Sequence, residues 1–312
     1  MTCHNCRIAC KRHGRDRKGN QRFKCRQCSK TFLEPQDKPL DGMYLPMSEA
    51  ELILKMLVEG SSVSTVERIT GVHHTTILKL LALAGERCER LMEDRIKALP
   101  VVDVQADEIW SFIQKKEKTK GPEEAHADEI GDNWTFVAIE WNSKLIVAWH
   151  TGRRTKRDTL EFTEKLADAT TGRFQLTTDG FGPYRAAVAE SVGQRVDFAQ
   201  LVKVYATTRE GSQRYSPAEV VEAVPYVRIG TPDPEKICTS HIERQNLTMR
   251  MGMRRFTRLT NGFSKTFKNH RAAIALHFAF YNFCRVHRTL RATPAMAAGI
   301  TNRAWGISDL LA

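Results

Sequence analysis

Residues 101–113 read VVDVQADEIWSFI, and this stretch indicates a β-strand whose two faces differ in chemistry. Apolar residues recur at every second position from Val102 to Ala106, whereas polar residues from Asp103 to Asp107 occupy the alternate positions. A period of two is the signature of a strand with one face turned toward a core. We therefore expect an acidic residue, Asp107, to lie within a strand that apolar neighbours hold in place.

The segments after this strand predict an α/β domain over residues 100–300. Two further strands and a polar hairpin loop are followed by a helix, a strand, a helix, another strand and finally helices. The predicted strands cover 134–141, 144–149, 174–178 and 195–202, and the predicted helices cover 159–169, 184–191, 239–252 and 267–284. This is the order of a ribonuclease H-like fold. Residues 206–236 are interpreted as an insertion, and the role of 205–237 is left open.

Three acids form the candidate catalytic site. Asp107 lies within the first strand, Asp179 follows a later strand, and Glu243 lies on a helix that also presents Asn246 and Arg250. Sites in α/β proteins form at the carboxyl ends of strands, where these acids would meet. Carboxylates are the ligands that Mg²⁺ and Mn²⁺ prefer, and two such ions can promote in-line attack on a phosphodiester.

Other residues compete for roles at this site. Asp103 shares a strand face with Asp107, and Glu108 follows it directly. His241 either assists proton transfer or caps the helix that carries Glu243. The sequence alone does not decide between these interpretations.

Charge is concentrated in two blocks of the 312-residue chain, whose net charge is +12. Residues 1–35 hold ten Lys or Arg and two acids, and residues 244–291 hold eleven Lys or Arg and no acid. Surfaces that merely face solvent usually interleave both signs, so we expect a polyanionic partner, of which nucleic acid is the usual one. Arg250, Arg254 and Arg255 in the second block are expected to contact it. The alternative is two solvated basic faces.

Five of the eight cysteines lie in the first 28 residues. Cys3 and Cys6 form one CxxC pair, and Cys25 and Cys28 form a second one, the spacing of a four-thiolate Zn²⁺ site. Residues 1–35 are too polar to build a core, so a structural Zn²⁺ would supply their folding free energy. Disulfides are the alternative, but no secretory signal accompanies them. Three further residues could replace a ligand: His4, Cys10 and His13.

Residues 46–97 predict a helix-turn-helix. Ser48 and Glu51 suggest a capping box for a first helix that ends at Gly60, with Leu52 on its apolar face. A second helix is expected over 63–69 with Ile69 inward, and a third over 73–84.

In that geometry the third helix presents several polar residues to a DNA major groove. These are His73, His74, Thr75 and Lys79. A plain three-helix packing unit is the alternative interpretation, and His73 is not a preferred N-cap residue.

Four motifs together resemble a DDE transposase, of the insertion-sequence type whose InsA and InsB portions form one polypeptide. They are the paired CxxC finger with its helix-turn-helix, the runs DEIWSF from Asp107 and TDGFGPY from Thr178, the run HIERQN from His241 with Arg250, and YNFCRVHRTL from Tyr281 with Thr293-Pro294. The resemblance covers nearly the whole chain. It implies metal-dependent DNA cleavage and strand transfer with Asp107, Asp179 and Glu243 as metal ligands. It also implies terminal inverted repeats as the DNA that the amino-terminal modules read.

Two other functions fit the same sequence: a DNA-binding repressor with an inactive catalytic domain, and a nuclease that is not part of a mobile element. Action on two DNA ends would require at least a dimer. No run of apolar residues is long enough to predict a membrane span. The resemblance implies double-stranded DNA as the partner and a bacterial cytoplasm, in association with the nucleoid, as the location.

Overall fold

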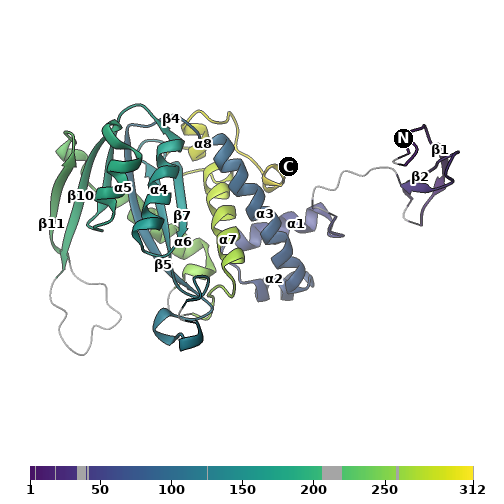
Figure 1. The fold of residues 1–312 in the computed structure, drawn as a ribbon, viewed down its shortest axis with the longest axis horizontal. Coiled ribbons are helices and arrows are strands. Elements are labelled where there is room, and N and C mark those ends of the chain that lie inside the picture. Colours follow the sequence, from purple (N-terminus) through teal and green to yellow (C-terminus); the bar gives the residue numbers. More distant parts are fainter. Residues whose placement is uncertain are drawn as a thin grey trace. The chain divides into compact units, whose positions relative to one another are not determined.

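The chain forms two compact units in the computed structural model, Met1–Tyr44 and Leu45–Ala312 (Figure 1). Each unit is described by itself. The structure describes residues 1–3, 5–17, 19–33, 40, 42–124, 126–205, 220–257 and 260–311. Among these residues, no helix is long and apolar enough to cross a membrane.

The first unit is a small three-stranded antiparallel sheet in the order β1-β2-β3. Its strands are Lys11–Arg15, Gln21–Lys24 and Thr31–Leu33, and β1 is exposed along its whole length. Cys3 and Cys25 are buried in this unit, at 1% and 0% exposure. Thiols therefore occupy the place that a larger domain would fill with aliphatic side chains.

Three helices open the second unit: α1 (Met47–Val58), α2 (Val63–Thr70) and α3 (His74–Arg95). Their existence and order confirm the three helices that the sequence predicts over this region. The predicted capping box at Ser48 is wrong, because α1 begins one residue earlier with Pro46 at its N-cap and has no side-chain cap. Leu52 and Ile69 are also not inward, with 49% and 64% of their surface exposed. Ile53, Leu54 and Val66 fill the buried positions instead.

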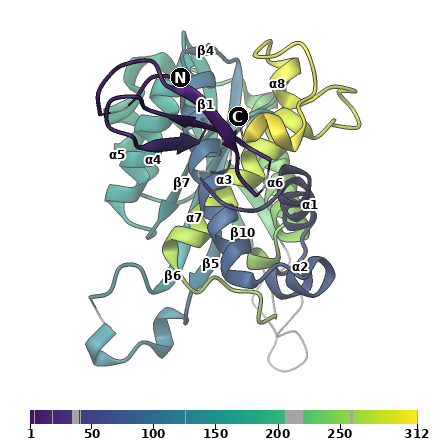
Figure 2. The same ribbon diagram turned by 90° about the vertical axis from the view of Figure 1, so that its right-hand side faces the viewer.

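Helix α3 is longer than the predicted recognition helix. Its first turns carry the residues expected to face DNA, and its later turns pack against α7 (Phe267–Ala279) (Figure 2). Gly85 makes this possible, because a Cβ atom there would lie 2.4 Å from the Cα of Ala272. The predicted helix-turn-helix and the body of the second unit thus share one helix.

A six-stranded mixed sheet in the order β11-β10-β9-β5-β6-β7 forms the body of this unit. Strands β5 (Asp103–Ile113), β6 (Gly131–Glu140) and β7 (Ile146–Gly152) form an antiparallel meander. Strands β9 (Phe174–Asp179) and β10 (Val196–Tyr205) extend the sheet parallel to β5. The strands lie where the sequence predicts them, to within a few residues.

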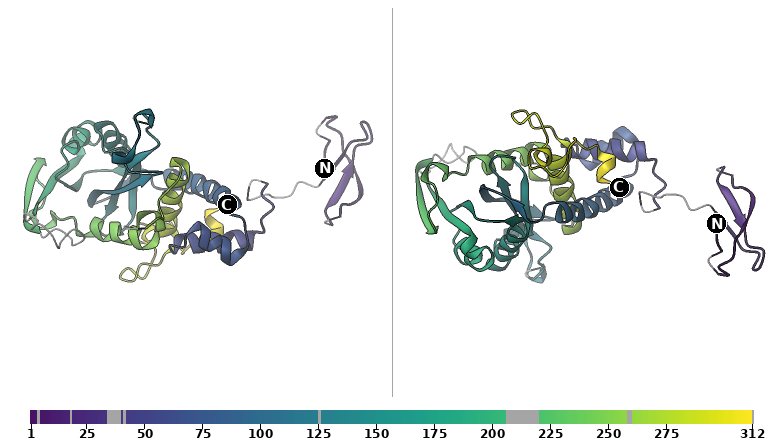
Figure 3. Two further views of the ribbon diagram at one scale, coloured as in Figure 1. Left: turned by 90° about the horizontal axis from the view of Figure 1, so that it is seen from below. Right: turned by 90° about the horizontal axis from the view of Figure 1, so that it is seen from above.

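Helices cover both faces of the sheet (Figure 3). Helices α4 (Lys156–Ala169) and α5 (Tyr184–Ser191) lie over one face, where Phe136 of β6 packs on Phe162 and Tyr184. Helix α6 (Ser240–Gly252) lies on the other face, where Gln105 of β5 accepts hydrogen bonds from its first turn. Helix α7 lies on that same face, since its His270 bonds Ser111 at 3.1 Å.

The predicted insertion contributes a strand that the sequence analysis did not anticipate. Strand β11 (Val220–Ile229) pairs antiparallel with β10 at the edge of the sheet. Pro225 is tolerated because an edge strand leaves one row of backbone N–H groups unpaired. Residues 206–219 lie outside the described part of the chain.

The remaining elements are short connections. They are β4 (Leu99–Pro100), β8 (Thr170–Thr171), α8 (Pro294–Ala297), the π-helical turn Phe280–Cys284 after α7, and short 3₁₀ turns at 117–119, 122–124, 193–195, 234–236, 254–256 and 307–310.

Candidate metal and nucleic-acid sites

Four thiols converge in the amino-terminal unit. Cys3, Cys6, Cys25 and Cys28 each place a sulfur within 4.8 Å of the others, and none of them forms a disulfide. The Sγ atoms of Cys3 and Cys28 are 3.6 Å apart. This donor set, closed and all sulfur, fits a tetrahedral structural Zn²⁺.

The electrostatics of the cluster favour at least one thiolate. Backbone N–H donation from Cys28 lowers the pKa of Cys25 to about 6, while the side-chain hydrogen bond with Cys28 raises the pKa of Cys6 to about 12. Cys10, one of the three spare candidates, does not belong to the group of four; its thiol donates to the carbonyl of Ile8. His13 is exposed on β1 and does not belong to that group either, and His4 lies outside the described residues.

The residues predicted to contact a DNA major groove lie around the start of α3. His73 is the N-cap, and its ring nitrogen Nδ1 accepts from the backbone N–H of Thr75. A histidine therefore performs the capping role that Ser or Thr usually takes. His74 Nδ1 lies 3.0 Å from Glu67 of α2. The side chains of His74, Thr75 and Lys79 are exposed, as expected for contact with a partner.

Three carboxylates meet at the sheet: Asp107 and Glu108 of β5 and Asp179 at the end of β9. Each offers an oxygen within 4.8 Å of the others. Strands β5 and β9 are adjacent and parallel, with Ala106 paired to Thr178, so the residues that follow this pair are neighbours. The structure thus brings together two of the three predicted acids and adds Glu108.

Hydrogen bonds fix the two aspartates in position. Asp179 Oδ1 accepts from the backbone N–H of Phe181 at 3.0 Å, which turns the chain at the end of β9. Asp107 Oδ1 accepts from the N–H of Glu108 at 2.8 Å, and its Oδ2 accepts from Asn246 of α6 at 2.9 Å. Asn246 is therefore the direct contact between the helix of Glu243 and the acid cluster.

Glu243, the third predicted acid, lies outside the cluster of three. Its carboxylate is paired with Lys203 of β10 and accepts from the hydroxyl of Thr239 at 2.5 Å. Glu243 still lies near enough for its charge to contribute to the raised pKa of Asp107. Lys203 acts on the pKa of both aspartates in the opposite direction, so its ammonium lies among the three predicted acids.

Arg154 supplies a second cation at the cluster. Its guanidinium lies 3.0 Å from Glu108 and 3.5 Å from Asp179. The same group stacks over the ring of Phe181 at 4.0 Å and over that of Trp134 at 4.8 Å. Two aromatic rings thus hold this arginine beside the acids.

Burial raises the pKa of every acid in the cluster. Desolvation, followed by the charge of Asp179, raises the pKa of Asp107 to about 7 and that of Glu108 to about 8. Desolvation also raises the pKa of Asp179. One oxygen of Glu108, Oε1, is buried without a hydrogen-bond partner in the described structure. Like charges held this close favour the binding of a cation, so the residues present fit a hard divalent metal.

The sequence predicts no role for Lys203 or Arg154, and it offers Glu108 only as a residue that competes with Asp107. Because side chains alternate along a strand, Asp107 and Glu108 are expected to point to opposite faces of the sheet. No sequence signal shows that Asp179 is accessible to side chains on both faces. Of the basic residues expected to bind DNA, Arg250 lies in the last turn of α6, and Arg254 and Arg255 follow that helix directly.

A scan against models of protein families finds no matching model, and a search of curated proteins finds no match. Among solved structures, the chain matches the crystal structure of the Mos1 strand transfer complex with 14% identity and a TM-score of 0.18. The match covers 52% of this chain and 60% of that one, less than two thirds of its length. Similarity this low supports no argument about fold or function.

Proposed function

We propose that the chain is a DDE-type transposase, which binds the terminal inverted repeats of an insertion sequence and catalyses metal-dependent DNA cleavage and strand transfer. The observation that carries this proposal is the convergence of Asp107, Glu108 and Asp179 within 4.8 Å on two adjacent parallel strands. A buried group of acids without enough counter-charge has no benefit for folding. Such a group is, however, suited to binding a metal.

The sheet topology supports the fold that the proposal requires. Three antiparallel strands in chain order, then two parallel strands added beyond the first one, match the order expected of a ribonuclease H-like domain. Asp107 lies on the central strand and Asp179 at the carboxyl end of its neighbour. The acids therefore occupy the edge where α/β sheets form their sites.

Asp107 and Asp179 would hold Mg²⁺ or Mn²⁺, two ions per site, together with Glu108 or Glu243. When bound, such ions activate the attacking oxygen and neutralise the leaving oxygen of a phosphodiester. The chain's own residues position these ligands: Asn246 orients Asp107, and the turn at Phe181 orients Asp179. Lys203 and Arg154 offset part of the acid charge and are suited to contact phosphate.

The two amino-terminal modules would provide DNA recognition. The four-cysteine cluster would hold a structural Zn²⁺ in a strongly basic finger, and α3 would present His74, Thr75 and Lys79 to a major groove. Arg250 at the end of α6 would contact the DNA backbone. Because two DNA ends must be processed together, we propose at least a dimer on DNA, within a bacterial cytoplasm and its nucleoid.

Cleavage assays with the full chain test this function. The substrate is a linear duplex that carries the DNA flanking the coding sequence, incubated with Mg²⁺ or Mn²⁺. We expect Asp107→Asn and Asp179→Asn to reduce strand cleavage by about 10²–10³-fold, the usual loss when a group that stabilises the transition state is removed. Binding to the same duplex should persist. Full cleavage by either variant would contradict the proposal, and Asp128→Asn, at an exposed acid, is the matched control.

A parallel comparison decides which glutamate completes the site. If Glu243 exchanges Lys203 for the metal, Glu243→Gln should abolish cleavage and Glu108→Gln should retain most of it. The opposite result would assign Glu108 as the ligand. In either case Asp107 and Asp179 keep their roles.

One observation favours a second candidate function, a DNA-binding repressor without catalysis. Glu243 is paired with Lys203 and does not join the acid cluster. A wild-type chain that binds the flanking DNA but cleaves nothing in Mg²⁺ or Mn²⁺ would support the repressor.

A further inference from the structure

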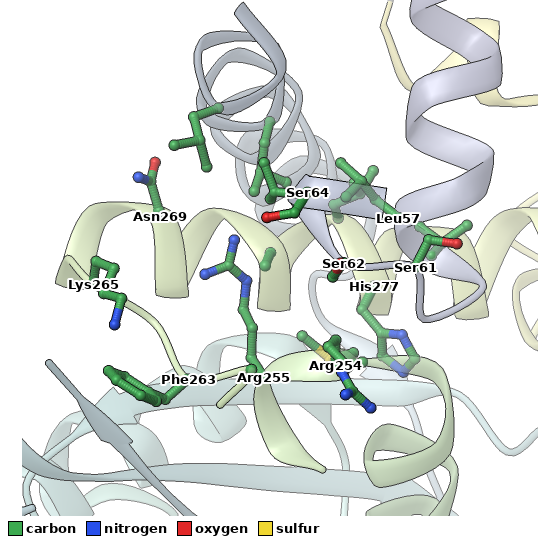
Figure 4. Close-up of a pocket in the computed structure, with 18 of the residues that line it drawn as sticks. Leu57, Ser61, Ser62, Ser64, Arg254, Arg255, Phe263, Lys265, Asn269 and His277 are labelled. Atoms are coloured by element: carbon green, nitrogen blue, oxygen red, sulfur yellow. The ribbon is translucent and has the colours of Figure 1, made fainter. Parts of the chain in front are cut away.

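A cavity of about 270 Å³ lies within the second unit, away from the acid cluster. The start of α2 forms one wall, and residues 253–255 and 261–265, between α6 and α7, form the other together with α7 itself (Figure 4). Leu57, Leu78 and Leu81 supply apolar surface, whereas the polar groups come from both walls.

The polar side of the cavity is cationic. Arg254, Arg255 and Lys265 line it, and no Asp or Glu is among its described lining residues. Arg255 donates to the hydroxyl of Ser264 at 2.9 Å. It has no carboxylate within ion-pair distance in the described structure. Figure 4 shows its guanidinium extending into the cavity from the segment between α6 and α7. A partly buried guanidinium without a counter-ion retains most of its donors for a ligand.

His277 is a second polar group without a partner. It is 3% exposed, and neither of its ring nitrogens has a hydrogen-bond partner among the described residues. The ring lines the cavity beside Arg254. Because a buried polar group without a hydrogen bond costs free energy, this ring indicates a ligand that supplies the missing bond.

The beginning of α2 faces the same space. Ser61, Ser62 and Ser64 line the cavity, and the Ser62 hydroxyl caps the helix by accepting from the N–H of Thr65. The N–H groups of Val63 and Ser64, in the first turn, have no partner within the helix. The positive end of the helix dipole adds to the cationic side chains opposite.

We propose that this cavity binds a phosphoryl group. Arg255 and Arg254 would donate to its oxygens from one wall, and the first turn of α2 would donate from the other. His277 of α7 would donate a further hydrogen bond. A phosphoryl group offers several acceptor oxygens and a negative charge. It would therefore complement a site that consists of hydrogen-bond donors and positive charge. Since one wall belongs to the helix-turn-helix and the other to α6 and α7, the ligand would link the two.

The phosphoryl group has two possible sources, a phosphodiester of bound DNA or a free phosphate compound. The site itself does not depend on the proposed strand transfer, because it can be measured without DNA or divalent metal. Titration of the full chain with inorganic phosphate, followed by calorimetry and by the melting temperature, is the direct test.

We expect saturable phosphate binding to the wild type. Arg255→Gln should weaken it by about tenfold, which corresponds to about 1.4 kcal/mol. Arg185→Gln, at an exposed arginine of α5, changes the net charge equally and should leave binding unchanged. If Arg255→Gln fails to fold, the double variant Arg254→Gln with Lys265→Gln takes its place, because both side chains lie at the rim.

The source is identified with a DNA duplex of arbitrary sequence. If a phosphodiester is the ligand, inorganic phosphate should compete with the duplex more than an equal ionic strength of chloride does. Arg255→Gln should then reduce the slope of log K against log salt by about 0.9, the value of one phosphate contact. If the ligand is free phosphate, neither effect occurs while phosphate binding persists. Absence of phosphate binding to the wild type, or equal binding by Arg255→Gln, overturns the proposal.

Discussion

At the scale of single residues, the candidate site depends on two adjacent acids of one strand. Asp107 contacts Asn246 of α6, and Glu108 contacts Arg154 on the side of α4 and α5. They point to opposite faces of β5, as neighbours in a strand must. Both still reach Asp179, because that residue stands at the end of the adjacent strand, where the chain turns away and leaves both faces open.

Asp103 shows what a buried acid costs when its carboxylate has no hydrogen-bond partner. It is 2% exposed, and neither carboxylate oxygen has a hydrogen-bond partner in the described structure. Burial raises its pKa to about 6. The ionised form is therefore disfavoured in the folded chain, and this penalty grows as the pH rises from about 4 to about 6 and stays constant above that range.

We predict that Asp103→Asn stabilises the protein, and more so at pH 8 than at pH 4.5. A pKa shift of this size corresponds to about 2–3 kcal/mol at pH 8, at 1.36 kcal/mol per pKa unit. Urea unfolding at the two pH values measures the effect. Asp94→Asn, at an exposed acid of α3, should change little at either pH. A loss of stability at pH 8 would show that Asp103 has a favourable partner.

At the scale of elements, α3 joins the residues proposed to contact DNA to the body of the second unit. Its first turns carry the exposed His74, Thr75 and Lys79, and its later turns pack against α7. Since α7 also bonds the sheet through His270, helices α3 and α7 together connect His74, Thr75 and Lys79 to the strand that holds Asp107. A recognition helix of three turns would not provide this connection.

We predict that Gly85→Ala destabilises the protein although alanine is the better helix former. The new Cβ would lie 2.4 Å from the Cα of Ala272, which cannot move without shifting α7. Overpacking costs about 1–3 kcal/mol, and the gain in helix propensity of about 1 kcal/mol offsets only part of it.

Thermal unfolding of Gly85→Ala measures this balance. The matched control is Glu86→Ala, at the next and exposed position, where we expect a change within about 0.5 kcal/mol. A higher melting temperature for Gly85→Ala would mean that α3 and α7 are not in close contact.

At the scale of the whole molecule, the two compact units differ in what holds them together. The unit Leu45–Ala312 has an apolar core around its six-stranded sheet, whereas Met1–Tyr44 buries mainly thiols. A unit this small gains too little from apolar burial to fold by that alone. Its folding free energy would therefore come from Zn²⁺.

We predict that chelation of Zn²⁺ unfolds Met1–Tyr44 and leaves the melting temperature of Leu45–Ala312 unchanged. Cys25→Ser should act in the same way, because a site of four thiolates loses its closed coordination when one is removed. Elemental analysis of the full chain measures its zinc content. The dispersion of the amide signals in its NMR spectrum shows whether Met1–Tyr44 is folded. Cys10→Ser should retain one Zn²⁺; loss of the metal from that variant would make Cys10 a ligand.

The sequence by itself determined most of the strands and helices and the cysteine cluster. These features are local: a period of two or of 3.6 residues, or a fixed CxxC spacing, is set by backbone geometry and is legible without a fold. Asp107 and Asp179 were predictable for the same reason, since each stands at a defined place on a strand. The edge strand β11, with its central proline, did not follow a strong local pattern and was missed.

Only the tertiary structure decided which side chains meet. That Glu108 joins the aspartates, that Lys203 pairs with Glu243 and that Arg154 lies between two rings depend on the order of strands in the sheet. Residues from β5 and β9 become neighbours through pairing across about 70 positions of sequence, which no periodicity encodes. The cavity between α2 and α7 has the same origin, because its two walls come from opposite ends of the second unit's chain.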